Sequence, residues 1–267
     1  MDPMILAALI LASAPPLLFA VIGETLTEKA GVINLSLDGS LLLAAMAAFV
    51  AAHATGSLVL GFAAGALVGA LIALIVAFAG LTLRVSMVAT GFVLALLARD
   101  LSYVLGDDFT HLPGPQVPPL DVPLLAQLPF IGPILFRQNI VVYASLLLVL
   151  GAWWFLNRTR HGLELSGVGE APAAAYARGI RVTRRRYFYA LLGGALVGVG
   201  GASFSLMVKP GWARPYGIEG TGWIALAIVI FGNWRPLRAA CGAFLFVALQ
   251  NAANTLQTLW PDVPTQI

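Results

Sequence analysis

Charged residues are scarce in this sequence. Of its 267 residues, 10% are charged and 60% are hydrophobic, whereas a soluble domain carries about 25% charged residues. Such a chain has too few polar groups to cover a water-soluble globule. Since a helix crossing a bilayer needs about 20 apolar residues, the apolar content suffices for about eight spans. The composition therefore predicts an all-α, polytopic membrane helix bundle.

Other scarcities exclude further classes of protein. The single cysteine, Cys241, excludes a disulfide framework and a cysteine metal cluster, and we expect it to be a small buried hydrophobe. The two lysines, Lys29 and Lys209, are followed by Ala and Pro, so the chain has no nucleotide-binding P-loop. The histidines lie fifty or more residues apart, which does not favour a metal site. We therefore predict no enzyme activity and no metal.

The hydrophilic stretches are too short to fold alone, so we predict a single transmembrane domain over residues 1–267. The first apolar run is expected to bend at Pro15 and Pro16, and the seventh is short enough to re-enter rather than cross. The eight runs expected to form helices cover residues 4–23, 31–53, 57–80, 85–105, 139–157, 187–208, 217–232 and 237–259.

The arginines predict the orientation in the membrane. Seven of the fifteen basic residues lie in the loop 158–186, which should be cytoplasmic under the positive-inside rule. The same rule explains the basic residues without a nucleic-acid partner. Alternation then places the loop 106–138 and both termini outside. Seven prolines stiffen that outer loop, which is either a docking rim for an external partner or a plain connector.

Small residues recur at helical spacing in two of the apolar runs. Gly61, Gly65 and Gly69 are four residues apart, as are Gly194 and Gly198. This spacing lets two helix backbones approach closely, which is how helices associate in lipid. We therefore expect these glycines to pack helices together.

The cytoplasmic loop 158–186 contains its own helix signals. Pro172 is tolerated in a first helical turn, the alanines that follow favour helix, and Gly179 can end it. We predict a two-turn helix with a small-residue face at the membrane surface. The loop is either a positively charged anchor or a surface shaped to enter a groove of another protein.

Two further groups of polar residues are candidates for a solute path. Asn34 and Asp38 are four residues apart, hence on one predicted helix face, and a carboxylate inside an apolar run should face a partner or a cavity. Amides in the last run could hydrogen-bond a neutral polar solute, or could instead bond neighbouring helices. These amides are Gln250, Asn251, Asn254 and Gln257.

Three segments of the chain resemble one known family. They are EKAGVINLSLDG (28–39), VGEAPAAAYARGIRVTRRRY (168–187) and IALAIVIFGNWRPLRAACGAFLF (224–246). Together they are similar to the permease subunits of bacterial ABC importers in the branched-chain amino acid and simple sugar permease group. The resemblance is closest to the nucleoside-type branch, which works with a basic-membrane-protein lipoprotein. Asp38, Ala171 and Arg238 depart from the family pattern.

The resemblance implies the function and the partners. The chain would be a permease in the bacterial inner membrane, importing a small polar solute, with a nucleoside as the first candidate and a simple sugar as the second. ATP and Mg²⁺ would be bound by a separate ATPase, and further partners would be membrane lipid, a second permease subunit and an extracytoplasmic lipoprotein. By the motif match, the coupling helix that contacts the ATPase would contain Gly169, Glu170, Pro172, Ala174, Ala177 and Gly179.

Two competing hypotheses are of other kinds. One is a self-contained secondary transporter in which Asp38, Arg99 and Asp100 couple ions to transport. The other is a membrane scaffold that transports nothing.

Overall fold

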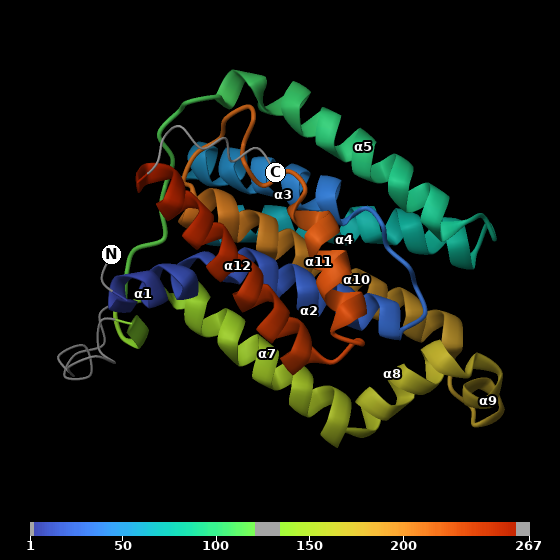
Figure 1. Cartoon of the computed structure of the whole chain (residues 1–267). Coiled ribbons are helices and arrows are strands. Elements are labelled where there is room, and N and C mark those ends of the chain that lie inside the picture. Colours follow the sequence, from blue (N-terminus) through green and yellow to red (C-terminus); the bar gives the residue numbers. More distant parts are fainter. Residues whose placement is uncertain (1–2, 121–133, 260–267) are drawn as a thin grey trace.

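The computed structural model describes the backbone of residues 3–120 and 134–259, and the side chains of 4–120 and 134–255. All regular elements within these ranges are helical (Figure 1). They are α1 (Pro3–Ser13), α2 (Pro15–Lys29), α3 (Leu37–Thr55), α4 (Leu58–Leu81), α5 (Met87–Gly106), η1 (Asp107–Phe109), α7 (Ile140–Arg158), α8 (Arg160–Glu170), α9 (Pro172–Ala177), α10 (Val182–Ser203), η3 (Phe204–Val208), α11 (Thr221–Phe231) and α12 (Pro236–Leu259).

Short polar side chains begin several of these helices. Ser57, Ser86, Asn139 and Thr159 precede α4, α5, α7 and α8, and each side-chain oxygen accepts a hydrogen bond from a backbone N–H of the first turn. Such N-caps satisfy donors that have no partner within the helix. The sequence therefore sets the starts of these four helices locally.

The structure does not confirm the predicted count of eight spans. Five helices (α3, α4, α5, α7 and α10 continued by η3) are long and apolar enough to cross a membrane, and the pair α1 and α2 makes a sixth if it counts as one bent span. The 11 residues of α11 cover only about 16 Å, so this helix is a half-span. α12 is not among the spans found within the described residues.

The predicted bend in the first span is confirmed. α1 ends at Ser13 and α2 begins at Pro15, with an angle of 45° between them. The second helix continues to Lys29, six residues beyond the predicted end at Gly23. Its last turns carry Glu24 and Glu28, which the hydropathy pattern had placed outside the span.

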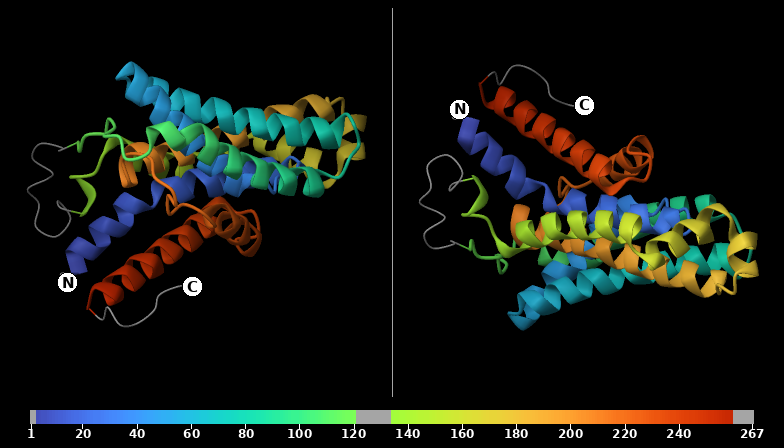
Figure 2. Two further views of the ribbon diagram at one scale, coloured as in Figure 1. Left: turned by 90° about the horizontal axis from the view of Figure 1, so that it is seen from above. Right: turned by 90° about the horizontal axis from the view of Figure 1, so that it is seen from below.

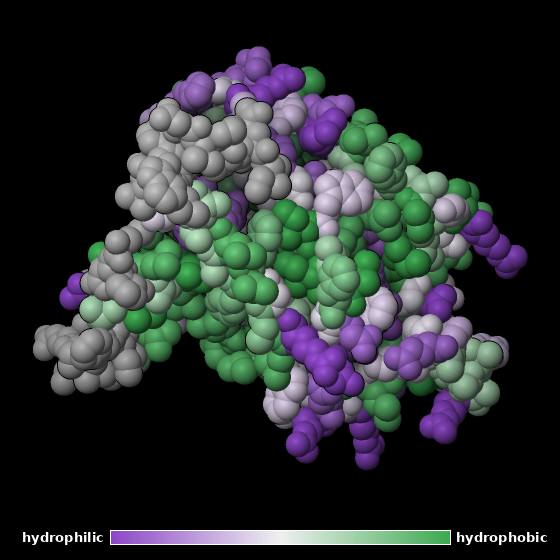
Figure 3. Space-filling model, viewed as in Figure 1, coloured by the Kyte–Doolittle hydropathy of each residue, from purple (hydrophilic) through white to green (hydrophobic). Residues whose placement is uncertain are grey.

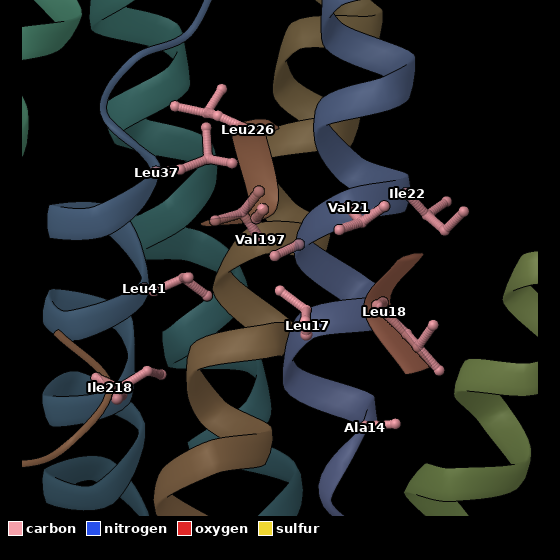
Figure 4. Close-up of a cluster of buried hydrophobic side chains, with 14 of the residues drawn as sticks. Ala14, Leu17, Leu18, Val21, Ile22, Leu37, Leu41, Val197, Ile218 and Leu226 are labelled. Atoms are coloured by element: carbon pink, nitrogen blue, oxygen red, sulfur yellow. The ribbon is translucent and has the colours of Figure 1, made fainter. Parts of the chain in front are cut away.

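The core of the bundle forms where α10 packs against α2, α3 and α4. The predicted glycine contacts are confirmed: a Cβ on Gly69 would lie 2.2 Å from the Gly194 carbonyl oxygen, and one on Gly198 would lie 2.1 Å from that of Gly65. The backbones of α4 and α10 therefore touch. On the other side of α10, leucines of α2 and α3 converge with Val197 and with Leu226 of α11 (Figure 4).

The loops gather at two opposite ends of the molecule (Figures 1 and 2). The arginine-rich end holds α8, α9 and the loop after α4, where the Thr82 hydroxyl lies 2.5 Å from that of Tyr187. At the proline-rich end, His53 Nδ1 lies 3.1 Å from the Pro113 carbonyl oxygen. Residues 113–118 belong to no helix or strand, and the prolines from Pro123 to Pro133 lie outside the described residues.

The surface agrees with a membrane location. In Figure 3, hydrophilic residues gather over the end of α5 that leads into η1, at the top of the view, and around α8 and α9. Hydrophobic surface lies between them. Figure 2 shows α1 and α12 side by side, diverging from the other helices.

Cys241, on α12, is exposed, so the prediction that it is buried was wrong. The wrong inference came from its apolar neighbours, which in a membrane protein can face outward as well as inward.

Candidate functional site

A compact projection, residues 160–180, extends from the arginine-rich end; we call it the knob. Its first helix, α8, was not predicted and begins where the Thr159 hydroxyl accepts a hydrogen bond from Gly162 N at 3.1 Å. Its second helix, α9, has Pro172 in its first turn and is followed by Gly179 at φ +82°. The predicted start and stop signals of the short helix are therefore confirmed.

The knob is fixed to the membrane helices through α8. Leu165 is fully buried against Leu26 of α2 and Tyr189 of α10. A Cβ on Gly169 would lie 2.1 Å from the Lys29 carbonyl oxygen, so the end of α8 meets the end of α2 backbone to backbone. Arg186 Nη2 donates to the Val168 carbonyl oxygen at 3.1 Å. A displacement of the knob must therefore move α2 and α10.

In contrast, α9 itself is largely uncovered. Five of its six residues are exposed, and only Ala175 is buried. The six predicted coupling residues do not share one helix, because the chain breaks at Ala171: Gly169 and Glu170 end α8, and Gly179 follows α9. Gly169 is half-buried against α2 and the other five are exposed. The exposed ones are Glu170, Pro172, Ala174, Ala177 and Gly179.

A second site lies where two helices begin. The start of α11 packs on the start of α3 so closely that a Cβ on Gly222 would lie 2.2 Å from Asp38 N. Asp38 Oδ1 accepts a hydrogen bond from Gly222 N at 3.1 Å. This carboxylate therefore ties two helix starts together, and its negative charge suits both.

Asn34 does not share a helix face with Asp38, and that prediction was wrong. α3 begins at Leu37, and Asn34 lies in the extended segment before it. Its buried side-chain oxygen accepts hydrogen bonds from Ser36 N at 3.1 Å and from Ser36 Oγ at 2.5 Å. Asn34 thus shapes the turn into α3, because an amide can satisfy donors of a backbone that has left the helix.

One face of α5 runs beside this junction. Phe92, Leu96, Arg99 and Tyr103 follow one another at intervals of four, three and four residues, so they form one stripe. The Phe92 ring lies 5.9 Å from that of Trp223 on α11. Arg99 Nε pairs with Asp100 Oδ1 at 3.2 Å, and both side chains remain exposed, at 42% and 66%.

An exposed ion pair in the body of a membrane-crossing helix is costly if it faces lipid. This part of α5 therefore faces water or another subunit. Glu219 and Arg99 are electrostatic neighbours of Asp38, which brings the charges of α3, α5 and the segment 209–220 into one place. We call this group the polar junction: Asp38, Arg99, Tyr103, Arg214 and Glu219, flanked by Phe92 and Trp223.

Glu219 organises the segment that leads into α11. Its carboxylate accepts hydrogen bonds from the Tyr103 hydroxyl and from the backbone amides of Tyr216 and Gly217. Burial raises the pKa of the Glu219 carboxyl, but these hydrogen bonds outweigh burial and bring the pKa below its ordinary value. Arg214 lies over the Tyr103 ring at 4.8 Å.

The Tyr216 side chain closes the same segment on itself. Its hydroxyl donates to the carbonyl oxygens of Lys209 and Gly211, and Lys209 Nζ donates to the Tyr216 carbonyl oxygen at 2.7 Å. Burial raises the pKa of the Tyr216 phenol, so it remains a donor at neutral pH. The segment is therefore a stiff element and not a free loop.

The amides of the last helix form no part of this junction in the described residues. α12 packs mainly on α1, α2, α7 and α11. Gln250 and Asn254 are exposed, and Asn251 donates to the Val247 carbonyl oxygen at 2.9 Å. The side chain of Gln257 lies outside the described residues. Only Asp38 among the predicted solute-path residues belongs to the polar junction.

Sequence reasoning missed Tyr103, Arg214 and Glu219 as site residues. Arg99 was noticed because it is a charge within an apolar run, but the other three lie near run boundaries, where polar residues are ordinary. Two carboxylates of α2 were also missed, the buried Glu24 and the half-buried Glu28. Glu28 accepts a hydrogen bond from Trp234 Nε1, and neither oxygen of the fully buried Glu24 has a hydrogen-bond partner among the described side chains and backbone.

Comparison with known proteins gives a consistent match over nearly the whole chain. Residues 6–264 match the family described as the permease component of the branched-chain amino acid transport system. A putative glucose ABC transporter permease, TsgC13 of Haloferax volcanii, is 36% identical over 94% of this chain and 79% of its own length. No solved structure matches.

Two bacterial relatives bear names that refer to nucleosides. The nucleoside ABC transporter permease NupC of Lactococcus lactis is 35% identical over 91% of this chain and 80% of its own length. The guanosine ABC transporter permease NupQ of Bacillus subtilis is 30% identical over 94% of this chain and 83% of its own length.

Proposed function

Because this chain belongs to the family of branched-chain amino acid transport system permease components, we propose that it is the membrane subunit of an ABC importer for nucleosides. A separate ATPase subunit binds ATP and Mg²⁺ and hydrolyses the nucleotide. A second, related permease subunit completes the pore, and an extracytoplasmic lipoprotein delivers the solute. The assembly lies in the bacterial cytoplasmic membrane.

The observation that supports ATPase coupling is the contrast between the two helices of the knob. α9 leaves five of its six residues uncovered, while α8 is joined to α2 and α10 through Leu165 and Gly169. A free helix on a fixed base suits a part that receives force from a partner. In this proposal, α9 inserts into a cleft of the ATPase.

Solute passes along the polar junction in this proposal. A nucleoside has a flat aromatic base and a ribose with hydroxyl groups. Phe92 and Trp223 offer aromatic faces on which a base can stack. Asp38 and Glu219 offer carboxylate acceptors for ribose hydroxyls, and Arg99 keeps the local charge near balance. The second permease subunit covers the exposed face of α5 and closes the path.

The movement that opens and closes the path is a shift of rigid bodies. The knob moves with the ATPase and carries the arginine-rich ends of α2 and α10. α11 reaches the arginine-rich end at Phe231 and begins at the polar junction, so a tilt of this half-helix moves Trp223 relative to Phe92. The stiff segment 209–220 holds the extracytoplasmic side of the path in place.

The ATPase contact is tested by Ala174→Arg, which puts a large charged side chain on exposed α9. We expect normal membrane insertion and loss of ATPase co-purification. His161→Arg is the matched control, because it adds a charge at an exposed position of α8 in the same knob. This variant should retain the ATPase. Normal co-purification and transport with Ala174→Arg would contradict the proposal.

Glucose is the second candidate solute, because the relative with 36% identity is named a putative glucose permease. Uptake of labelled guanosine and glucose by cells with and without this chain separates the two. We expect uptake of the nucleoside alone to require the chain. Uptake of both solutes without the chain would support the scaffold hypothesis.

The ion-coupled alternative is tested with the purified chain in liposomes. Under our proposal, a proton or sodium gradient drives no nucleoside uptake in the absence of the ATPase. Gradient-driven uptake that is lost in Asp100→Asn would favour a secondary transporter.

A further inference from the structure

A cavity lined by described residues lies beside the knob and has no role in the proposed transport mechanism. It has a volume of about 680 Å³ and opens between α8, the turn after α9, and the first turns of α10. We call it the arginine pocket. Its polar lining is formed by Arg178, Arg181, Arg184, Arg185 and Glu164.

The charges of the arginine pocket do not balance. Arg185 Nη2 donates to Glu164 Oε2 at 2.7 Å, and that carboxylate is the only acidic group in the lining. The other three arginines make no ion pair among the described residues. A formal surplus of three positive charges therefore surrounds one cavity, and a bound anion would offset it.

The arginines also lie at the less favourable end of a helix. Arg181 precedes α10, and Arg184 and Arg185 lie in its first turns, which contain no acidic residue and no side-chain cap. The N-terminal end of a helix has partial positive charge and favours anions. Cations there are stabilised when an anion lies between them and the helix.

An apolar stripe continues from the pocket into the membrane region. Arg184, Phe188 and Leu192 are spaced four residues apart on α10, and all three lie on the surface. Phe188 lines the pocket and is 55% exposed, and Leu192 is 40% exposed. A ligand that fits has an anionic head in the arginine pocket and an apolar chain along α10.

We propose that the arginine pocket binds the phosphate headgroup of an anionic phospholipid, with an acyl chain along Phe188 and Leu192. Three guanidinium groups can hydrogen-bond phosphate oxygens in the bidentate manner that arginine favours. Basic pockets at the cytoplasmic side of membrane helices suit such headgroups. A bound headgroup joins the turn after α9 to α10 and so braces the knob.

The test is native mass spectrometry of the purified full-length chain with phosphatidylglycerol or phosphatidylcholine. The test variant is Arg181→Gln/Arg184→Gln. The control, Arg158→Gln/Arg160→Gln, removes the same charge from the same loop outside the pocket lining. An arginine near an anionic headgroup is worth about fivefold in affinity, so the test variant should bind phosphatidylglycerol about twenty-five-fold more weakly, and the control like the unmodified chain.

Equal binding by all three proteins would overturn the proposal, because general attraction to the basic surface would then explain it. Phe188→Ser tests the apolar part: it should weaken phosphatidylglycerol binding and leave glycerol phosphate binding unchanged. If glycerol phosphate binds as tightly as the lipid, the pocket binds a free phosphate compound instead.

A protein partner is the remaining alternative. If Arg181→Gln/Arg184→Gln abolishes ATPase co-purification and leaves lipid binding intact, the pocket is part of the protein interface and the lipid proposal fails. Melting temperatures of the variants without added lipid serve as the folding check. A test variant that melts at the temperature of the control and has lost phosphatidylglycerol supports the proposal.

Discussion

At the scale of single residues, Glu219 concentrates the most interactions in the polar junction. Its carboxylate accepts from one side chain of α5 and two backbone amides of its own segment. The Tyr103 contact joins residues 116 positions apart. Hydrogen bonds to a charged group are worth more than neutral ones, so Glu219 should be needed for the shape of the junction.

We expect Glu219→Ala to lower the free energy of unfolding by about 2–3 kcal/mol, because it leaves donors without partners. Thermal unfolding of the detergent-solubilised chain measures this loss. Tyr143→Phe is a suitable control, since it removes one exposed hydrogen bond, from the Tyr143 hydroxyl of α7 to the Leu135 carbonyl oxygen. A loss no larger than that of the control would contradict the central role of Glu219.

The same residue predicts a pH dependence. Because hydrogen bonding brings the folded-state pKa of Glu219 below its ordinary value, the folded chain binds a proton less readily there than the unfolded chain. The stabilisation is therefore present above the ordinary glutamate pKa and is lost as pH falls through the lower, folded-state pKa. Melting curves over the acid range should show this loss, and Glu219→Gln should reduce it.

Asp38 allows its structural and functional roles to be separated. Asp38→Ala leaves Gly222 N without its acceptor and should cost about 1–3 kcal/mol. Asp38→Asn keeps an oxygen acceptor and removes the charge, so it should unfold almost like the unmodified chain. If Asp38→Asn nevertheless abolishes uptake, the charge belongs to the solute path. Unchanged uptake would limit Asp38 to joining α3 and α11.

At the scale of helices, α4 and α10 form the most extensive contact among the described residues. Glycines on both helices bring the two backbones together, and in lipid such packing replaces the hydrophobic effect as the source of helix association. The half-helix α11 has a different role. It begins with its first turn against α3, so its start lies at the proposed solute path.

The α4–α10 contact predicts different outcomes for two identical substitutions. Gly69→Ala puts a Cβ 2.2 Å from the Gly194 carbonyl oxygen and should cost about 1–3 kcal/mol. Gly151→Ala on α7 meets nothing within 4 Å and should be neutral or stabilising by up to about 1 kcal/mol. Melting temperatures of the two variants give the comparison. Similar values would show that the helices adjust easily.

At the scale of the whole molecule, the structure puts the knob and the proline-rich segment at opposite ends (Figure 1). The loop after α4 and the turn between α11 and α12 lie at the knob's end: Arg235 shares a pocket with Lys29 and Glu170. The arginine distribution predicts that this end is cytoplasmic.

The orientation is measurable by cysteine labelling. In a Cys241→Ala background, Tyr176→Cys in the knob and Asp108→Cys at the other end introduce one exposed thiol each. With a membrane-impermeant maleimide, we expect Asp108→Cys to react in right-side-out vesicles and Tyr176→Cys only in inside-out vesicles. The reverse pattern would place the knob outside and exclude ATPase coupling through α9.

Local rules account for the parts that the sequence predicted well. The bend before Pro15 and the start and stop of α9 at Pro172 and Gly179 depend on residues that restrict the backbone wherever they occur. The glycine spacing predicted helix contacts because small residues permit them in any bundle. The number of spans stays a prediction for α11 and α12, because an apolar run reveals its hydropathy and not its depth or direction.

By itself, the sequence determined that this is a helical membrane protein with one basic end and a short helix displayed there. These properties follow from composition and from interactions between near neighbours. Only the tertiary structure decided which polar residues meet. Asp38 reaches Gly222 across 184 positions, and Tyr103 reaches Glu219 across 116, because helix packing brings the starts of α3 and α11 beside α5. No periodicity along the chain encodes that convergence.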